Sequence, residues 1–383
     1  MSNQRHLFKL AENIHYLNCA YMSPLLASVE EAGVNALVRL RNPSAIKPAD
    51  FFSEQGKAKK LFGRLINGDP GQVAIIPSVS YGLKTAMTNI PVNNGTHSIM
   101  VYDEFPSDYY ALADWCRSND KQLKIIPAPD GNREKGKRWN EAILDAIQLE
   151  TSAVVLSSVH WMNGTRFDME KIGMRCREVG ARFIVDGSQS VGVLPIDVAK
   201  YKIDALVCTG YKWLFGPYSI GLAYYGESFK EGKPIEDSWM NRANADDFTN
   251  LTGYTDQYTS GAGRFNVGES SHFILLPMLI RALEQVLEWQ KLSLQIYCGT
   301  LIQPLLQWLR ENEFALEDED YRVNHLFGIA LPETNNRDRL LKDLQEKNIV
   351  VSVRSNMIRV STHLFNTGQD VDQLIGVFQN SYR

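Results

Sequence analysis

The most reactive position that the sequence offers is a lysine set among aromatic residues. The apolar run 205–208 predicts a buried strand, and the chain continues as Thr209-Gly210-Tyr211-Lys212-Trp213-Leu214-Phe215-Gly216-Pro217. An ammonium group among aromatic rings is poorly solvated, so desolvation lowers the pKa of Lys212 and leaves an amine that can attack a carbonyl carbon. The alternative is a lysine whose charged end extends from an aromatic patch into water.

A carboxylate closes a second apolar strand upstream of this lysine. Residues 183–185 are Phe, Ile and Val, and Asp186-Gly187-Ser188-Gln189 follows. In parallel α/β sheets ligands bind beyond the carboxyl ends of the strands, so Asp186 and Lys212, 26 residues apart, are expected to face one crevice. A Schiff-base lysine with a carboxylate for a pyridinium nitrogen is the arrangement that pyridoxal 5'-phosphate (PLP) requires. Asp186 by itself could also be a helix N-cap, and only the pair favours the cofactor.

The two motifs together resemble a known family. Asp-Gly-Ser-Gln followed by Thr-Gly-Tyr-Lys-Trp-Leu-Phe-Gly-Pro is similar to the signature of class V aminotransferases, a group of fold-type I PLP enzymes. The group includes cysteine desulfurases, kynureninase and isopenicillin N epimerase-like proteins. The resemblance runs from Tyr16 to about Leu374 and is closest to the isopenicillin N epimerase-like and cysteine desulfurase-like branch. It implies an aldimine on Lys212, which then moves the substrate Cα proton, with Asp186 keeping the pyridine nitrogen protonated.

A phosphate site is expected where a strand meets a helix. Residues 73–77 predict a strand, and Ser78-Val79-Ser80 opens the next helix. A helix N-terminus offers free backbone N–H groups and a favourable dipole for a phosphate, although Ser78 or Ser80 could serve only as an N-cap. The resemblance implies that these three residues hold the PLP phosphate.

The resemblance implies further contacts with the cofactor ring. Phe105 stands at the position of the stacking ring, where desulfurases have His; a Phe can stack on the pyridine but cannot shuttle a proton. Trp161 stands where many desulfurases have an Asn near the cofactor hydroxyl, which leaves Gln189 as the expected partner of PLP O3′. Thr209 and Tyr211, beside the lysine, are also expected to contact the cofactor.

Arg359 is expected to bind the α-carboxylate of the substrate. It lies in the short apolar stretch Ile358-Arg359-Val360-Ser361, where the family keeps an arginine for this task. The planar guanidinium can make two parallel hydrogen bonds to a carboxylate. A structural ion pair with an Asp or Glu is the alternative role, and Arg354 is the competing candidate. The resemblance also implies Ala20 and Tyr21 as substrate-side residues, unless their segment is a plain structural turn.

Three departures from the family pattern leave the reaction open. His160 is either catalytic or a satisfied core histidine. Glu269 stands where many relatives have a Thr that contacts the partner subunit's phosphate, and a carboxylate there would be repulsive unless Arg264 or another cation intervenes. No cysteine follows Cys298, so we expect no thiolate on a C-terminal loop and no usual cysteine desulfurase activity.

The expected function is PLP chemistry at the Cα of an amino acid or an amino-acid derivative, of the epimerase or aminotransferase type. The alternatives are a lyase, either kynureninase-like or selenocysteine/cysteine lyase-like, and a catalytically silent binding protein of the same fold. The motifs do not choose among epimerisation, transamination and elimination, because all of them use the same lysine, aspartate and phosphate site.

The bulk composition excludes several other classes of function. The chain has 383 residues, 44% of them hydrophobic and 22% charged, with a net charge of −4. We expect no nucleic-acid or membrane partner, because there is no basic excess and no apolar run of membrane-spanning length. The five cysteines are scattered and odd in number, which argues against a metal site or a disulfide framework and favours a cytoplasmic protein without a signal peptide.

The apolar periodicity predicts an α/β protein: a large, doubly wound, mostly parallel seven-stranded sheet domain and a smaller C-terminal α+β domain. We expect an N-terminal segment 1–24 that packs on the small domain, a PLP-binding domain 25–270, and a connecting helix with the small domain in 271–383. Family resemblance adds a homodimer with sites at its interface. Helices are expected mainly at 25–67, 140–149, 169–180, 274–310, 336–346 and 371–378. Strands of the small domain are expected at 328–331, 350–353 and 357–361. We also expect a polar loop at 130–137 and a polar excursion at 226–258.

Overall fold

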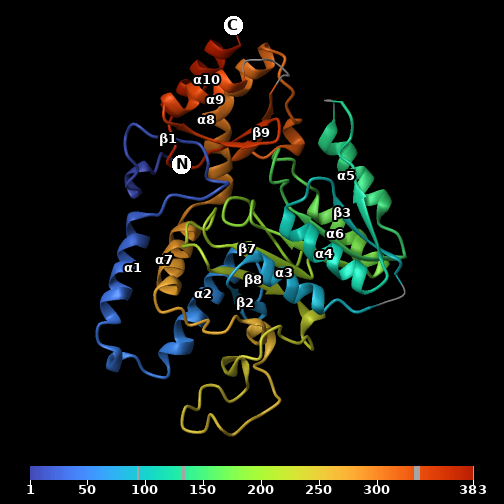
Figure 1. The fold of residues 1–383 in the computed structure, drawn as a ribbon, viewed down its shortest axis with the longest axis vertical. Helices are drawn as coiled ribbons and strands as arrows, with labels where there is room; N and C mark the ends of the chain where they lie inside the picture. Colours follow the sequence, from blue (N-terminus) through green and yellow to red (C-terminus); the bar gives the residue numbers. More distant parts are fainter. Residues whose placement is uncertain (93–94, 132–133, 332–336, 383) are drawn as a thin grey trace.

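A seven-stranded sheet forms the centre of the larger domain (Figure 1) in the computed structural model, which describes residues 1–92, 95–131, 134–331 and 337–382. Its strands are β2 (Val73–Ile76), β3 (His97–Val101), β4 (Gln122–Ile126), β5 (Thr151–Ser157), β6 (Arg182–Asp186), β7 (Ala205–Thr209) and β8 (Gly221–Tyr225). They lie in the order β2-β8-β7-β6-β5-β3-β4. Only β8 runs antiparallel to its neighbours, β2 and β7. The predicted mostly parallel, seven-stranded sheet is confirmed.

Helices cover both faces of this sheet, as a doubly wound fold requires. They are α1 (Ala27–Arg39), α2 (Asp50–Ile66), α3 (Val79–Thr88), α4 (Pro106–Ser118), α5 (Lys135–Ala146), α6 (Met169–Val179) and α7 (Leu275–Glu288). Successive residues of β5 enter different cores: Val154 and Leu156 join the core under α2, α5, α6 and α7, while Ala153 and Val155 join the core under α3 and α4. Burial on both faces explains why this strand is apolar throughout.

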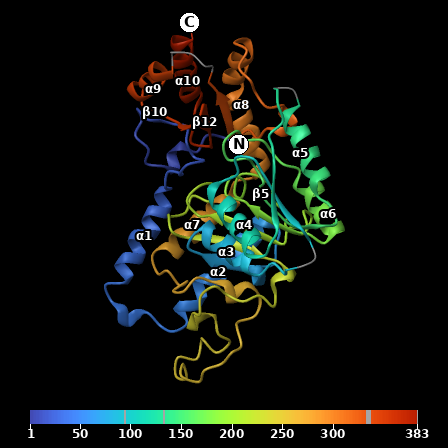
Figure 2. The same ribbon diagram turned by 45° about the vertical axis from the view of Figure 1, so that its right-hand side comes forward.

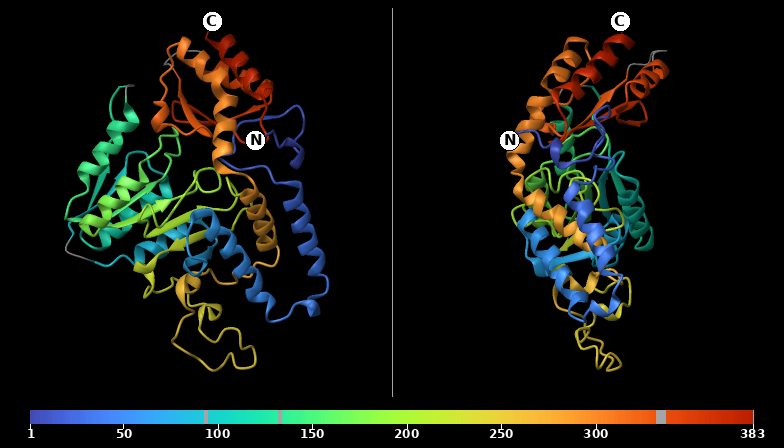
Figure 3. Two further views of the ribbon diagram at one scale, coloured as in Figure 1. Left: turned by 180° about the vertical axis from the view of Figure 1, so that it is seen from behind. Right: turned by 90° about the vertical axis from the view of Figure 1, so that its left-hand side faces the viewer.

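The smaller domain is an antiparallel sheet covered by helices. Its sheet has the order β11-β12-β9, with β9 (Leu326–Ala330), β11 (Ser352–Arg354) and β12 (Met357–Ser361). Helices α8 (Lys291–Glu311), α9 (Arg337–Glu346) and α10 (Gly368–Ser381) pack beside it. The N-terminal segment lies against this domain (Figure 3), because β1 (His15–Tyr16) pairs in parallel with β10 (Ile349–Val350).

The chain between β8 and α7 forms a long loop, both ends of which pack on the large domain through Phe229 and Phe265. It contains only short 3-10 turns, at Glu227–Phe229, Trp239–Asn241 and Gly261–Phe265. Figure 2 shows it as a yellow loop at the far end of the molecule from the C-terminus. The polar composition of 226–258 therefore predicted a real excursion. No helix in the described ranges has the length and apolarity needed to cross a membrane.

Several predicted boundaries were wrong. Helix α5 begins at Lys135 and ends at Ala146 rather than spanning 140–149, because its buried positions Trp139 and Ile143 alternate with charged residues that hid the helical period. The expected polar loop is correspondingly shorter, and its residues 132–133 lie outside the described residues, as does the expected helix start at 336.

The expected connecting helix and one expected strand are each divided. The helix breaks into α7 and α8 at Trp289, whose ψ of 120° is extended. The indole of Trp289 packs edge-on against Phe215 at 5.3 Å between ring centroids, and this packing outweighs continuation of the helix. Residues 350–353 belong to two strands, β10 and β11, in two different sheets. Tertiary pairing, which the local pattern does not encode, decides both cases.

Candidate active site

A cavity of about 290 Å³ opens at the carboxyl ends of β6 and β7. Asp186 is the last residue of β6, and Lys212 follows β7 by three residues; Asp186 pairs with Val207 in the sheet register. Both side chains line this cavity. The parallel arrangement of the two strands is what brings together two residues that are 26 positions apart in the sequence.

The Lys212 amine is buried among aromatic rings. Its Nζ lies 5.5 Å from the ring centroid of Phe105 and 5.8 Å from that of Tyr211, and the residue is only 8% exposed. Burial lowers the pKa of Lys212 to about 8, and the nearby Asp186 carboxylate opposes part of that effect. A substantial fraction of the amine is therefore neutral near pH 8 and able to act as a nucleophile or a base.

Three buried carboxyl groups lie next to one another behind this lysine. Asp186 accepts a hydrogen bond of 2.8 Å from the Ser188 amide, and Glu104 accepts bonds from Ser157 and from the Phe105 amide. Neither oxygen of Asp108 makes a hydrogen bond of standard geometry within the described part of the chain. Burial raises the pKa of Asp108 well above its usual value, and the adjacent Asp186 and Glu104 raise it further.

Two adjacent carboxyl groups in a buried site do not both ionise, because each charge disfavours the other. Burial also raises the pKa of Asp186, but the Ser188 hydrogen bond and the Lys212 charge lower it. These contacts favour the charged form of Asp186 over that of Asp108. A single buried carboxylate at this position is suited to a cationic ring nitrogen.

The opposite wall of the cavity is the N-terminus of α3. Ser78 is the N-cap, and its Oγ accepts from the Tyr81 amide at 3.2 Å, while Ser80 Oγ pairs with Ser107 Oγ at 2.9 Å. Thr209 Oγ1, on the wall formed by β7, is buried and has no partner among the described residues. Free amides of a first helical turn and an unsatisfied hydroxyl fit the phosphate of PLP.

Aromatic rings form the remaining wall. Phe105 lines the cavity and meets Trp161 edge-on, with ring centroids 5.5 Å apart. Tyr211 and Tyr218 also line it, and their centroids lie 4.6 Å apart. A flat ligand that enters the cavity therefore meets an aromatic surface beside Lys212.

Gln189 and Ala20 lie below the cavity rather than in its lining. Gln189 Nε2 donates to the Ala20 carbonyl at 3.1 Å, and its Oε1 accepts from Trp213 Nε1 at 2.8 Å. The Gln189 amide carries two N–H donors, of which the bond to Ala20 uses one. Ala20 is 1% exposed, while its neighbour Tyr21 is 54% exposed and lies near Tyr211.

Arg359 and Arg354 both lie near the ring of Trp161. The guanidinium carbon of each is 6.0 Å from the Trp161 ring centroid. Arg359 Nη1 donates to the Trp161 carbonyl at 2.9 Å, and Nη2 donates to Ser352 Oγ at 3.4 Å. Burial, and then the charge of Arg354, lower the pKa of Arg359 to about 10.

No carboxylate of the described chain forms an ion pair with Arg359, which is 2% exposed, and its Nε has no partner there. The alternative role of a structural ion pair therefore finds no support in these contacts. A buried guanidinium without a counter-ion is costly, and an anionic ligand would relieve that cost.

Two other candidates lie away from the cavity. His160 is 2% exposed and packs against Trp139 and Phe167, with its Nε2 3.3 Å from the Tyr102 carbonyl. Burial lowers the pKa of His160 to about 4, which fits the core reading of this histidine. Glu269 instead lines a separate cavity beside Phe51 and Trp239.

Sequence reasoning missed Asp108, Ser107 and Ser188 among the residues around Lys212. A signal for Asp108 was present: it shares a helical face with Leu112 and Trp115, at spacings of four and seven, and an acid on an apolar face is unusual. Nothing in the local pattern marked Ser107 or Ser188, which line the cavity from the first turn of α4 and from the turn after β6. No cluster of three or more potential metal ligands occurs in the ranges that the structure describes.

Comparison with known proteins identifies the family. The family model described as Aminotransferase class-V matches residues 49–374. The chain belongs to this family. The class-V chain is 24% identical over 319 residues to an uncharacterized aminotransferase, YcbU, of Bacillus subtilis, covering 83% of this chain and 81% of that protein. It is also 24% identical over 371 residues to kynureninase of Shouchella clausii, covering 93% and 82%.

Solved structures show the same fold. A form of C-DES with glycine covalently linked to its PLP cofactor superposes with a TM-score of 0.86 at 18% identity, over 100% of both chains. The apo cysteine desulfurase of Thermococcus onnurineus NA1 gives 0.84 at 17% identity, over 99% of both chains. Together with the family match and the fit of the cavity, this makes the chain a PLP-dependent enzyme of the class-V family with fold type I.

Proposed function

We propose that this enzyme transfers an amino group to or from an amino acid. The observation that carries the proposal is the single near-neutral base of the cavity, Lys212, whose pKa burial lowers to about 8. No histidine or cysteine of the described chain lines the cavity with it. A single base can take a proton from the substrate Cα and deliver it to a second atom on the same side of the cavity.

Epimerisation is the less favoured variant of the same chemistry. Inversion at Cα requires that a proton leave from one side of this carbon and another arrive from the opposite side. A second acid on the opposite wall of the cavity would supply that proton. Phe105 provides no proton there, and burial raises the pKa of Tyr211 to about 12. These groups support amino-group transfer over inversion.

We further propose how the chain holds PLP, which when bound supplies an electron sink for a carbanion at Cα. Lys212 attaches the cofactor covalently and Asp186 pairs with the ring nitrogen. The wall made by Ser78, Val79, Ser80 and Thr209 receives the phosphate. Phe105 and Tyr211 would flank the ring, and the remaining N–H of Gln189 is the proposed donor to O3′.

For the substrate, Arg359 is proposed to bind the α-carboxylate, supported by its lack of an acidic partner. Arg354, the competing candidate, has its guanidinium carbon at the same 6.0 Å from the Trp161 ring centroid. Ala20 and Tyr21 are proposed to border the entrance; only Tyr21 offers a side chain there, because Ala20 is 1% exposed.

A lyase is the second candidate. Its specific support is the match to kynureninase, which extends over 93% of this chain. Cleavage of a side-chain bond and amino-group transfer both begin with proton movement at Cα, so the residues named above serve either reaction. The two are separated by their products rather than by the site.

We propose that the enzyme works as a cytoplasmic homodimer, organised as the segments 1–24, 25–270 and 271–383. Exposed apolar residues support an interface: Val34 and Leu37 on α1 are 53% and 54% exposed, and Trp239 is 43% exposed. All five cysteines are buried free thiols, which is consistent with a reducing compartment.

A screen of the PLP-loaded enzyme tests the proposed function. Spectral changes are recorded with L- and D-amino acids in the presence of α-keto acids, and products are identified by mass spectrometry. A new amino acid formed from the keto acid supports transfer. Racemised substrate, or a shortened side chain with no amino-group transfer, would replace this proposal with epimerase or lyase activity respectively.

A further inference from the structure

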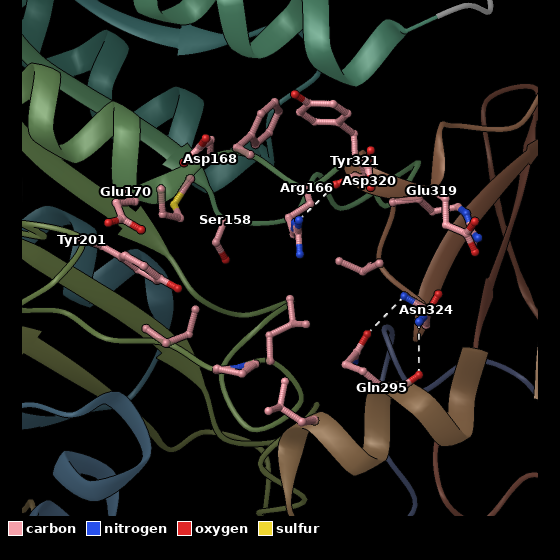
Figure 4. Close-up of a pocket in the computed structure, with 18 residues that line it drawn as sticks. Ser158, Arg166, Asp168, Glu170, Tyr201, Gln295, Glu319, Asp320, Tyr321 and Asn324 are labelled. Atoms are coloured by element: carbon pink, nitrogen blue, oxygen red, sulfur yellow. Dashed lines mark hydrogen bonds between the residues drawn. The ribbon is translucent and has the colours of Figure 1, made fainter. Parts of the chain in front are cut away.

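A second cavity, of about 730 Å³, lies between the two domains (Figure 4), and we call it the interdomain cavity. One wall belongs to the large domain, where Ser158, Asp168 and Tyr201 lie around it; the other is α8 and the chain that leads to β9. It shares no lining residue with the cavity around Lys212. Gln295, on α8, lines the interdomain cavity and begins a chain of hydrogen bonds that leads toward the residues beside Lys212.

Gln295 uses its whole side-chain amide to join the two domains. Its Nε2 donates to the Val193 carbonyl at 3.1 Å and lies 2.9 Å from His325 Nδ1. Its Oε1 accepts from the backbone N–H of Asn324 at 3.2 Å, and Asn324 Nδ2 donates to the Gln295 carbonyl at 3.2 Å, as the dashed lines in Figure 4 show. Because a backbone N–H can only donate, the contact with Asn324 fixes the orientation of the amide and holds both N–H groups of Gln295 toward Val193 and His325.

His325 continues this chain of hydrogen bonds into the large domain. The side chain is fully buried, and its Nε2 lies 2.9 Å from the Gln189 carbonyl oxygen. A neutral imidazole has one donor and one acceptor nitrogen, and the contacts with Gln189 and Gln295 use one each. Arg322, three residues earlier, is also buried, but its terminal nitrogens have no hydrogen-bond partner among the described residues. His325 is by contrast fully bonded, and one of its two bonds crosses between the domains.

The two carbonyls that receive these bonds belong to the loop that follows Asp186. Gln189 and Val193 lie three and seven residues beyond that carboxylate, and both residues are buried. Within the described ranges, neither carbonyl accepts a hydrogen bond from a backbone N–H. A buried carbonyl without a partner is costly. The small-domain side chains therefore supply the donors that this loop lacks.

His325 also packs against the residue next to Lys212. Its ring meets the Trp213 indole edge-on, with ring centroids 4.6 Å apart and an interplanar angle of 85°. Trp213 Nε1 in turn donates to Gln189 Oε1 at 2.8 Å. The side chain of Gln189 is thus held by Trp213 and Ala20, and its backbone is held by His325. One histidine therefore contacts both Gln189 and the neighbour of Lys212.

We propose that His325 is a positioning residue for the PLP site: it fixes the Gln189 backbone and the Trp213 ring, and so directs Gln189 toward PLP O3′. Gln295 keeps His325 in the tautomer that donates to Gln189. His325 does not line the cavity around Lys212, so it acts through its two neighbours. The inference rests on the proposed role of Gln189 as the donor to O3′.

The test compares PLP affinity and the absorption spectrum among variants of the full chain. Apoenzyme is titrated with PLP, and the ratio of the visible to the near-ultraviolet band of the bound cofactor is recorded, because a hydrogen bond to O3′ changes this ratio. His325→Leu should weaken PLP binding by about tenfold and change the band ratio, since it removes the bond to Gln189 and the edge contact with Trp213. His325→Gln keeps an N–H donor at the reach of Nε2 and should bind PLP within about threefold of the parent.

His363→Leu is the matched control. His363 is equally buried, and its ring centroid lies 6.0 Å from that of Trp213, but neither of its nitrogens has a hydrogen-bond partner in the part of the chain that the structure describes. This variant removes a buried imidazole without removing a bond, so PLP affinity should stay within about twofold of the parent and the band ratio should not change. Gln295→Leu should weaken PLP binding in the same direction as His325→Leu but by less, and it replaces that variant if His325→Leu does not fold.

Gln189→Leu separates this inference from the cofactor contact on which it rests. If Gln189→Leu changes PLP affinity and the band ratio while His325→Leu and Gln295→Leu change neither, the contact stands and His325 is not a positioning residue. If Gln189→Leu changes neither quantity, the proposed contact with O3′ fails, and the inference fails with it. No amino acid enters these measurements, so they do not depend on which reaction the enzyme catalyses.

Two further results would overturn the inference. Equal loss of PLP affinity in His325→Gln and His325→Leu would show that the donated hydrogen bond does not matter. Equal loss in His363→Leu and His325→Leu would show that any buried imidazole beside Trp213 has the same effect, so that packing alone explains the role of His325.

Discussion

The cavity around Lys212 and the interdomain cavity differ in how their charges are satisfied. In the first, Lys212 lies near Asp186: Asp186 ends β6 and Lys212 follows β7, two neighbouring strands of one domain. In the second, Asp168 and Glu170 pair with Lys171 and Lys200, and Glu319 and Asp320 are exposed. The first cavity therefore keeps opposite charges buried together, whereas the acids around the second pair with surface lysines or face water.

The two cavities are also connected. Gln295, on the wall of the interdomain cavity, bonds to His325 Nδ1, and His325 Nε2 lies 2.9 Å from the Gln189 carbonyl. Because a carbonyl can only accept, Nε2 carries the proton and Nδ1 accepts from Gln295. Burial lowers the pKa of His325 to about 3, so this neutral form persists at physiological pH. Variants around Lys212 test the buried charges of the first cavity without changing the residues that line the second.

Replacing the lysine should have the largest effect. Lys212→Ala removes both the attachment point of PLP and the base at Cα, so turnover should fall by about 10³-fold or more. Borohydride reduction of the parent, followed by peptide mapping, should find the pyridoxyl group on Lys212. A label on another lysine would refute the assignment.

The substrate arginine should come next. Arg359→Lys keeps the charge but loses the planar fork, and kcat/KM should fall about a hundredfold, or about 2–3 kcal/mol, with PLP still bound. Arg354→Lys is the matched control, because Arg354 lies at the same distance from Trp161. If Arg354→Lys loses activity while Arg359→Lys keeps it, the carboxylate site belongs to Arg354.

The rate at which the apoenzyme takes up PLP should depend on pH. Attack on the aldehyde requires neutral Lys212, and burial places its pKa at about 8. Below that pH the rate should rise about tenfold per pH unit, and it should level off above it. Stopped-flow absorbance measures the rate. A profile still rising above pH 10 would show a lysine with an ordinary pKa.

Asp108→Asn should change turnover by only a few-fold, because a protonated carboxyl and an amide are both neutral. Its effect on stability has a defined sign. The native pKa of Asp108 is raised, so between pH 4 and that pKa the folded state holds a proton that the unfolded state has lost, and the parent loses stability as pH rises. The variant lacks this loss, so its melting temperature relative to the parent should increase from pH 4 to 8. A constant difference would mean that Asp108 is ionised.

Cys298→Ser should have the smallest effect. Cys298 is fully buried in α8, its Sγ lies 3.6 Å from the Thr362 carbonyl, and burial raises its pKa to about 12. A thiol in this state is a poor nucleophile. Turnover should stay within about twofold of the parent, and neither protein should release much sulfide from L-cysteine. Robust sulfide production by the parent would show that the enzyme is a desulfurase after all.

The sequence by itself determined the strands, the family and the core of the site. Buried parallel strands are short, apolar and followed by polar turns, so the ends of β6 and β7 could be recognised together with Asp186 and Lys212. The same holds for the Ser78 N-cap after β2, because strand-to-helix junctions have local signatures. These features depend on neighbours in the chain.

Only the tertiary structure decided the rest. The break at Trp289 and the division of residues 350–353 between two sheets depend on packing partners far away in the sequence. The placement of His160 in the core, the pairing of Asp108 with Asp186 and the unpaired state of Arg322 likewise arise from burial among distant residues. Local patterns record the periodicity of one element, whereas charge, burial and cavity shape are properties of several elements in contact.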